Sequence, residues 1–235
     1  MMKIKILNIF SMAEKTFKNL IANKAILFMM ILYPILAIVF RVMFPLDRYI
    51  EPLKSFYVMN ITMIPILIMS SIIAEEKEKG IIKYLILSGV SSIEYLIGTI
   101  FCILIGVTIS SMLYSILLLP NKIYGDMTYF LITILGAMPS ILLGCIIGMK
   151  TNNQVEVGAK AAPIAMVIGM LPMFKGNNIF VDNVINKIYS SVIFNYMDGK
   201  VKMENLTSII IVFINILILS FLFSIVYKNS KLDRN

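Results

Sequence analysis

Long runs without a charged side chain constrain this chain more than any other feature of its sequence. Five such runs lie between the following pairs of charged residues: Lys24 and Arg41, Lys54 and Glu75, Glu94 and Lys122, Asp126 and Lys150, and Glu204 and Lys228. A helix needs about 20 mainly apolar residues to cross the hydrocarbon core of a bilayer. Hydrophobic residues make up 59% of the 235-residue chain and charged residues only 14%, which is more apolar than a soluble domain. The sequence therefore predicts an all-α integral membrane protein.

We predict six transmembrane helices within a single domain that includes residues 1–235. The predicted spans are 25–44, 55–74, 95–119, 128–149, 157–174 and 206–227. The fifth span has the weakest pattern, because the uncharged run between Lys160 and Lys175 is short. It crosses only if the Lys160 side chain snorkels to the interface. The distribution of Lys and Arg places the N-terminus in the cytoplasm with five spans or with six, so this rule leaves both numbers open.

Two segments outside these spans are predicted to lie at the membrane surfaces. In residues 3–23, apolar side chains recur at spacings of three and four from Ile6 onward, and Lys15 and Lys18 lie on the other side. This pattern is typical of an amphipathic interfacial helix, with a solvated basic tail as the alternative. Residues 179–197 contain the apolar stretch Ile188–Met197, which is too short to cross. We interpret this segment as re-entrant on the outer side, with an interfacial helix as the alternative.

The residue types exclude several kinds of chemistry. The chain has no histidine, which excludes His-based catalytic and metal sites. Cys102 and Cys145 lie inside apolar runs, where cysteine usually packs as a small hydrophobe. The net charge of +8 suits anionic lipid headgroups rather than nucleic acid in a membrane protein. No carboxylate lies deep in a predicted span, so energy for any pumping is expected from outside the membrane. Sodium coupling through backbone carbonyls stays open.

Small residues recur at every fourth position in three predicted spans. The three rows are Gly98, Cys102, Gly106 and Ser110; Gly136, Ser140, Gly144 and Gly148; and Ala161, Ala165 and Gly169. Such a row lets a neighbouring helix approach closely, and close packing drives helix association in lipid. We favour packing within one subunit, with a dimer interface as the alternative.

The connection between the second and third predicted spans is the most informative segment. A charged run, Glu75-Glu76-Lys77-Glu78-Lys79, leads into Gly80 and a short amphipathic stretch. Ser91 or Ser92 can cap the next helix, with Glu94 in its first turn. The whole connection predicts a compact polar elbow that suits docking to another protein, and the alternative is a solvated loop. Paired glutamates also mark intramembrane proteases that resemble CAAX-processing enzymes, but those enzymes need histidines.

This connection resembles the coupling segment in the permease subunits of type-2 ABC exporters. The matching positions are Glu75, Glu76, Glu78, Lys79, Gly80, Leu85, Leu87, Ser88, Val90, Ser91, Glu94 and Gly98. The chain departs from the pattern at Gly89 and Ser92, where Pro is common, and at Thr99, where Lys is common. The resemblance implies that residues 75–88 form a cytoplasmic coupling helix that docks into an ATP-binding subunit. It implies the following ATPase-coupling residues: Glu75, Glu76, Glu78, Lys79, Gly80, Leu85 and Ser88.

The resemblance also implies six spans, the number on which the charge distribution does not decide, together with the partners and the location of the protein. It implies a second permease subunit, identical or different, in the bacterial cytoplasmic membrane, with both termini cytoplasmic. The chain contains no GxxxxGK[ST] phosphate loop, so ATP and Mg²⁺ are expected on a separate ATP-binding subunit and this chain is expected to bind no cofactor and to catalyse no reaction. The alternative is a stand-alone channel or an ion-coupled carrier.

The first predicted span suggests a class of substrate. It is rich in Met and aromatic residues, among which Phe28, Tyr33 and Phe40 are candidates to line a cavity. Such side chains adapt to varied apolar partners, and ordinary packing or contact with lipid is the alternative. Compact permeases of the type that this chain resembles include exporters of phenol-soluble modulins. We therefore expect an amphipathic or hydrophobic peptide substrate, with glycan, lipid or drug export as alternatives.

Overall fold

The computed structural model describes residues 5–118, 127–176, 178–198 and 206–229. Within these ranges the chain forms helices and no strand, which confirms the all-α prediction for them. The helices are α1 (Ile6–Ala22), α2 (Lys24–Met43), α3 (Leu46–Glu78), α4 (Ile81–Leu87), α5 (Ser92–Leu118), α6 (Met127–Lys150), α7 (Gln154–Met170), the 3-10 helix η2 (Leu171–Phe174), α8 (Ile179–Ile185), α9 (Tyr189–Met197) and α10 (Leu206–Asn229).

Six segments of the described chain are long and apolar enough to cross a membrane. They are Lys24–Met43, Arg48–Glu78, Ile93–Ile116, Tyr129–Lys150, Gln154–Phe174 and Leu206–Val226. Each overlaps one predicted span, including the doubtful fifth. The predicted span 55–74 is much shorter than α3, which begins at Leu46. Charged residues end an apolar run without ending a helix, because they continue the helical backbone beyond the hydrocarbon core.

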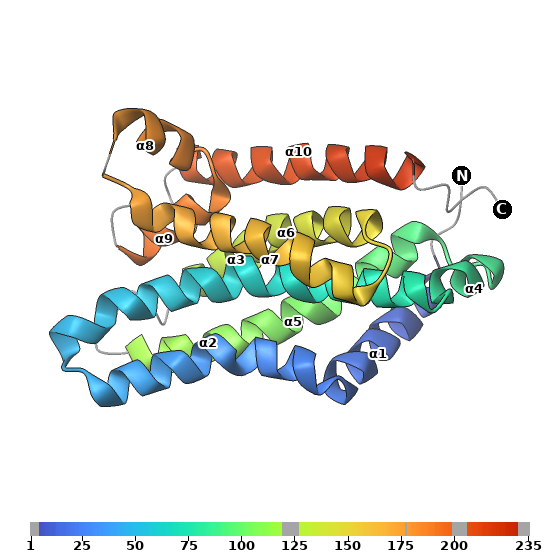
Figure 1. Ribbon diagram of the computed structural model, residues 1–235, viewed down its shortest axis with the longest axis horizontal. Coiled ribbons are helices and arrows are strands. Elements are labelled where there is room, and N and C mark those ends of the chain that lie inside the picture. Colours follow the sequence, from blue (N-terminus) through green and yellow to red (C-terminus); the bar gives the residue numbers. More distant parts are fainter. Residues whose placement is uncertain (1–4, 119–126, 177, 199–205, 230–235) are drawn as a thin grey trace.

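Helix α3 lies at the centre of the bundle (Figure 1). It packs against α2, α5, α6 and α7, and 89% of its apolar window is buried. Helix α10 lies at the rim, where it packs against α6 and α9, and only 6% of its window is buried. The two helices thus represent the interior and the periphery of the same bundle.

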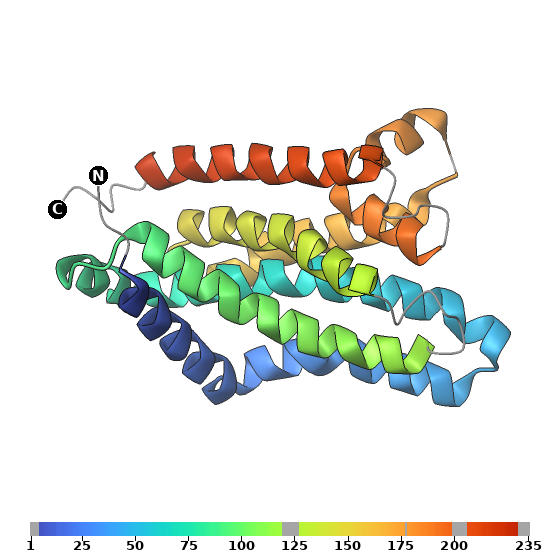
Figure 2. The same cartoon turned by 180° about the vertical axis from the view of Figure 1, so that it is seen from behind.

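The two ends of the bundle differ in structure. Helix α4, the beginning of α1 and the end of α10 lie at one end, which we call the α4 end (Figure 1). Helices α8 and α9 lie at the opposite end, and the same separation is seen from behind (Figure 2). The predicted segment 179–197 is therefore two short helices, of which α9 packs against α3, α6 and α10 and α8 is largely exposed.

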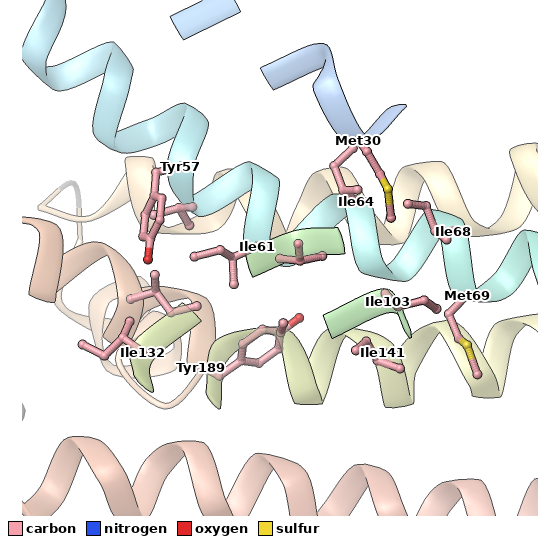
Figure 3. Packing of buried hydrophobic residues seen from close by; sticks show 14 of the residues in the cluster. Met30, Tyr57, Ile61, Ile64, Ile68, Met69, Ile103, Ile132, Ile141 and Tyr189 are labelled. Atoms are coloured by element: carbon pink, nitrogen blue, oxygen red, sulfur yellow. The ribbon is translucent and has the colours of Figure 1, made fainter. Parts of the chain in front are cut away.

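Isoleucine, methionine and tyrosine side chains fill the space around α3 (Figure 3). Two buried tyrosines bond hydroxyl groups of α6: the Tyr57 hydroxyl is 2.7 Å from the Thr133 hydroxyl, and the Tyr189 hydroxyl is 2.8 Å from the Ser140 hydroxyl. Buried polar groups need such partners, because an unpaired hydroxyl is costly in an apolar interior. These bonds link α3 to α6 and α6 to α9.

The rows of small residues lie at contacts between helices of this one chain. A Cβ atom at Gly98 would lie 2.7 Å from a carbonyl oxygen of α1, and one at Gly144 would lie 2.8 Å from a carbonyl oxygen of α3. Gly106 faces α2, Gly136 faces α9 and α3, Gly148 and Gly169 face α3, and Ala165 is fully buried. The backbones approach each other closely at these points because no side chain separates them.

Candidate functional site

The elbow at the α4 end consists of two bends with a short helix between them. Helix α3 ends at Glu78, and Gly80 follows with a positive φ of 68°. Gly89 has a φ of 80° after α4. Glycine reaches this left-handed region without the penalty that a Cβ atom brings, which is why it commonly ends helices. The segment 75–88, which the resemblance implies to be the coupling helix, is thus divided at Gly80: residues 75–78 are the last turn of α3, and the short amphipathic stretch forms the separate helix α4.

The helix after the elbow begins with a capping box. The Glu94 backbone N–H donates to the Ser91 hydroxyl at 3.3 Å, and the Ser91 N–H donates to the Glu94 carboxylate at 3.0 Å. This reciprocal pair satisfies two N–H groups at the helix start, so Ser91 rather than Ser92 is the cap. The Glu94 carboxylate also accepts from the Asn8 amide at 2.8 Å and from the Lys5 N–H at 2.6 Å. Glu94 thereby holds the start of α1 against the start of α5.

The charged residues Glu75, Glu76, Lys77 and Glu78 belong to the last turn of α3, and Glu76 is the most deeply buried of them. The Glu76 carboxylate lies 2.7 Å from the Lys15 ammonium of α1, and the side chains are 3% and 31% exposed respectively. We expected Glu76 to face an ATP-binding partner, and the structure corrects this: α1 covers it. The sequence pattern assigns Lys15 only to the polar side of residues 3–23, because a residue so far from Glu76 along the chain gives no sign of the pairing.

The next two charged residues bind two other helices. The Lys77 ammonium donates to the Met149 carbonyl at 3.0 Å and to the Thr151 carbonyl at 2.8 Å, at the end of α6. The Glu78 carboxylate accepts the Gln154 N–H at 3.0 Å, at the beginning of α7. A cation suits a helix C-terminus and an anion suits a helix N-terminus, because of the helix dipole. Three consecutive residues of α3 thus hold α1, α6 and α7.

Helix α4 presents an apolar and aromatic face to the outside. Ile82 is buried against the bundle, whereas Tyr84 and Leu87 are each 72% exposed. Of the predicted coupling residues, Glu78, Lys79 and Ser88 are exposed, while Glu75, Gly80 and Leu85 are partly buried. Glu75 is paired with Lys79 at 2.5 Å. Sequence reasoning missed Tyr84, although an aromatic residue in a short helix between two glycines was a usable signal.

The three residues predicted to line a cavity do not come together. The rings of Tyr33 and Phe40 lie 6.3 Å and 5.1 Å from the ring of Phe56, so they form an aromatic cluster between α2 and α3. The Tyr33 hydroxyl donates to the Met63 sulfur at 3.2 Å. Phe28 is 58% exposed on another part of α2. Two of the three therefore pack against α3, and the third lies apart.

The side chains at the α4 end provide charge pairs and an exposed apolar face. Among the described residues, no three metal-ligating side chains come together. Comparison with protein-family models and with characterised proteins gave no match. Helix α4 thus exposes an apolar face next to the end of α3, whose charged residues contact α1, α6 and α7.

Proposed function

We propose that this protein is the membrane-spanning permease subunit of an ATP-driven ABC exporter, and that α4 is its coupling helix. The observation that carries the proposal is α4 itself: a short helix between Gly80 and Gly89 that exposes Tyr84 and Leu87 at 72% each. Exposed aromatic and leucine side chains on a projecting helix suit insertion into a groove of a partner. The resemblance of residues 75–98 to the coupling segments of such permeases gives the partner, a separate subunit that binds ATP and Mg²⁺.

The contacts of α3 supply a route from α4 to the spans. A displacement of α4 acts on the end of α3, whose centre packs against α2, α5, α6 and α7. Glu76 and Lys77 extend this connection to α1 and to the end of α6. Packed helices move as rigid elements rather than deforming continuously. Closure of two ATP-binding subunits would thus reach several spans at once.

The exposed side chains of α1 support an orientation of the bundle in the membrane. Helix α1 exposes Ile6, Leu7 and Phe10 at 69%, 81% and 70%, and the Lys18 side chain at 73%. These side chains suit an interfacial helix with its apolar side in the headgroup region. We place the α4 end in the cytoplasm of a bacterial cell, both termini on that side, and α8 with α9 as the outer re-entrant segment. A second permease subunit completes the membrane part.

The proposed substrate is an amphipathic or hydrophobic peptide. The support is the resemblance to compact exporters together with the described outer segment, in which α8 and α9 are only 7 and 9 residues long. If such peptides neither stimulate the ATPase activity of the purified complex nor accumulate outside vesicles, the peptide assignment fails. Flux through the protein alone, without ATP, would favour a channel or carrier.

Site-directed cross-linking tests the role of α4. Cys102 and Cys145 are both buried, so the background from native thiols is low. We expect Tyr84→Cys to cross-link to the ATP-binding subunit that co-purifies with the full-length protein. The matched control is Phe180→Cys on α8, which is 75% exposed at the opposite end and should not cross-link. Equal reaction at both positions, or none at Tyr84→Cys in a complex that co-purifies, contradicts the proposal.

A further inference from the structure

An apolar cleft of about 230 Å³ lies between α1, α2 and α5. Phe17 and Ile21 of α1, Leu27 and Met30 of α2, and Ile105 and Ile109 of α5 are among the residues that line it. The three helices lie side by side (Figure 2). Phe17, Ile21 and Ile109 are more than half exposed, so the cleft opens on the outer surface of the bundle. In a membrane this surface faces the lipid.

The two polar side chains in the cleft are already hydrogen-bonded within the protein. The Cys102 thiol donates to the Ala13 carbonyl at 2.9 Å. The Ser110 hydroxyl donates to the Val107 carbonyl at 2.9 Å and accepts from the Asn60 amide at 2.8 Å. A polar ligand would lose its own hydrogen bonds with water and gain few in return. The occupant must therefore be apolar along the length of the cleft.

The size of the cleft distinguishes two apolar occupants. One turn of an α-helix with its side chains fills a cylinder about 10 Å wide and 5.4 Å long, roughly 400 Å³, which exceeds the cleft. A methylene group occupies about as much volume as a water molecule in the liquid, roughly 30 Å³. The cleft thus accommodates a stretch of about seven or eight methylene groups. A single acyl chain therefore fits inside the cleft, whereas a turn of a helical peptide would fill it and extend beyond it.

The junction of α1 and α2 places basic side chains near the cleft, which favours an occupant with an anionic group. Lys24 is exposed one helical turn before Leu27, and residues three apart lie on one side of a helix. None of the ion pairs among the described residues includes Lys24. Lys18, which is paired with Glu14, lies one turn before Ile21. Basic residues near a membrane surface attract anionic headgroups.

We propose that the cleft is a binding site for one membrane phospholipid, with an acyl chain between α1, α2 and α5 and an anionic headgroup at Lys24. The bound chain fills the space that α1 leaves against α2 and α5, and so stabilises the position of α1. The site is independent of the proposed export function, because it would bind lipid in a channel or a carrier as well.

Native mass spectrometry of the full-length protein tests the proposal. The probes are phosphatidylglycerol and phosphatidylcholine with identical acyl chains. We expect one phosphatidylglycerol to stay bound through detergent exchange. Ile105→Trp fills the cleft and should weaken this binding at least tenfold. The matched control is Ile214→Trp on α10, which is 47% exposed outside the cleft and should bind as the unmodified protein does.

A second variant tests the contribution of the lipid headgroup separately from that of the acyl chain. It also does not depend on whether Ile105→Trp folds. Lys24→Gln should reduce the preference for phosphatidylglycerol over phosphatidylcholine about fivefold, the factor that corresponds to about 1 kcal/mol per basic residue at an anionic surface. Binding of phosphatidylcholine should stay unchanged.

Several results would overturn the lipid assignment. Unchanged lipid binding by a folded Ile105→Trp, or unchanged headgroup preference in Lys24→Gln, excludes this site. Displacement of the phospholipid by an amphipathic helical peptide assigns the cleft to a peptide. A disulfide-linked dimer of Leu27→Cys assigns it to a second copy of the chain.

Discussion

Helices α3 and α10 are both apolar and long enough to cross a membrane, yet they occupy opposite positions in the bundle. Of the six candidate spans, α10 has the highest mean hydropathy and is 6% buried, whereas α3 is less hydrophobic and 89% buried. The buried fraction does not simply fall as hydropathy rises, since α7 has the lowest mean hydropathy of the six spans and is only 28% buried. A soluble protein would bury α10 first.

The difference follows from the solvent. Lipid is as apolar as leucine, so burying a leucine against protein gains little, and helix association depends on close packing and polar bonds. Helix α3 has Asn60, Thr62 and Ser70 fully buried. The Asn60 amide bonds the Ser110 hydroxyl of α5, whereas the hydroxyls of Thr62 and Ser70 bond carbonyls of α3 itself and lie at its packed contacts. The described part of α10 has Val212 as its buried hydrophobic residue. The helix with polar and small contacts becomes central, and the most hydrophobic helix faces lipid.

The largest expected effect comes from a close contact of α3. A Cβ atom at Gly144 would lie 2.8 Å from the Ile66 carbonyl oxygen and 2.9 Å from the Met69 Cβ. Gly144→Val should lower the free energy of unfolding by about 3 kcal/mol, because the backbones must separate. Ser224→Val on the exposed side of α10 is the matched control and should change it little. Denaturation in mixed micelles measures both. Similar losses of unfolding free energy in the two variants would show that close packing matters no more for α3 than for α10.

A truncation compares the packing of the two helices directly. Ile68 on α3 is fully buried, and Leu217 on α10 is 67% exposed. Ile68→Ala should cost about 2 kcal/mol, because the cavity removes van der Waals contacts that lipid cannot replace. Leu217→Ala should cost less than about 0.5 kcal/mol. Thermal unfolding in lipid bicelles gives both values, and a Leu217→Ala loss as large as that of Ile68→Ala contradicts the comparison.

The ion pair between α1 and α3 should contribute a smaller amount. Glu76→Gln removes a buried partner of Lys15, but Lys15 is 31% exposed and recovers part of its hydration. We expect a loss of about 1–2 kcal/mol in unfolding free energy. Hydrogen exchange of the α1 amides should also become faster.

The control for this prediction is Glu51→Gln. The Glu51 side chain is 64% exposed in its pair with Lys54, so the change should cost less than about 0.5 kcal/mol. If α1 exchanges at the same rate in both variants, Glu76 does not hold α1 against α3.

The smallest expected effect concerns the bond between α3 and α5. The Asn60 amide donates to the Ser110 hydroxyl at 2.8 Å, and such bonds between helices in lipid contribute about 0.6 kcal/mol on average. Asn60→Ala should cost about that amount. Ser224→Ala is the control, because the Ser224 hydroxyl bonds the Ser220 carbonyl within α10. A double-mutant cycle with Ser110→Ala measures the coupling energy between the two residues. A coupling energy of zero would show that this bond does not contribute to the central position of α3.

The features that could be predicted from the sequence depend on residues close together in the chain. The candidate spans follow from the length of the uncharged runs, since crossing a bilayer needs about 20 residues of one kind. The cap at Ser91 depends on Glu94, three positions later. The bend at Gly80 depends on one residue that accepts a positive φ. The boundaries of the helices do not follow from the uncharged runs, because α3 continues to Leu46 through the charged residues that end its apolar run.

The sequence by itself therefore determined that the chain forms apolar helices, where five of the six candidate spans lie, and where the elbow bends at Gly80. Only the tertiary structure decided that α3 is central, that Glu76 meets Lys15, and that Lys77 binds the end of α6. The physical reason is that lipid dissolves every apolar helix about equally well. Which helices pack together then depends on small residues and on polar bonds between segments far apart in the sequence. The pattern of residues along one helix does not show which other helix it will contact.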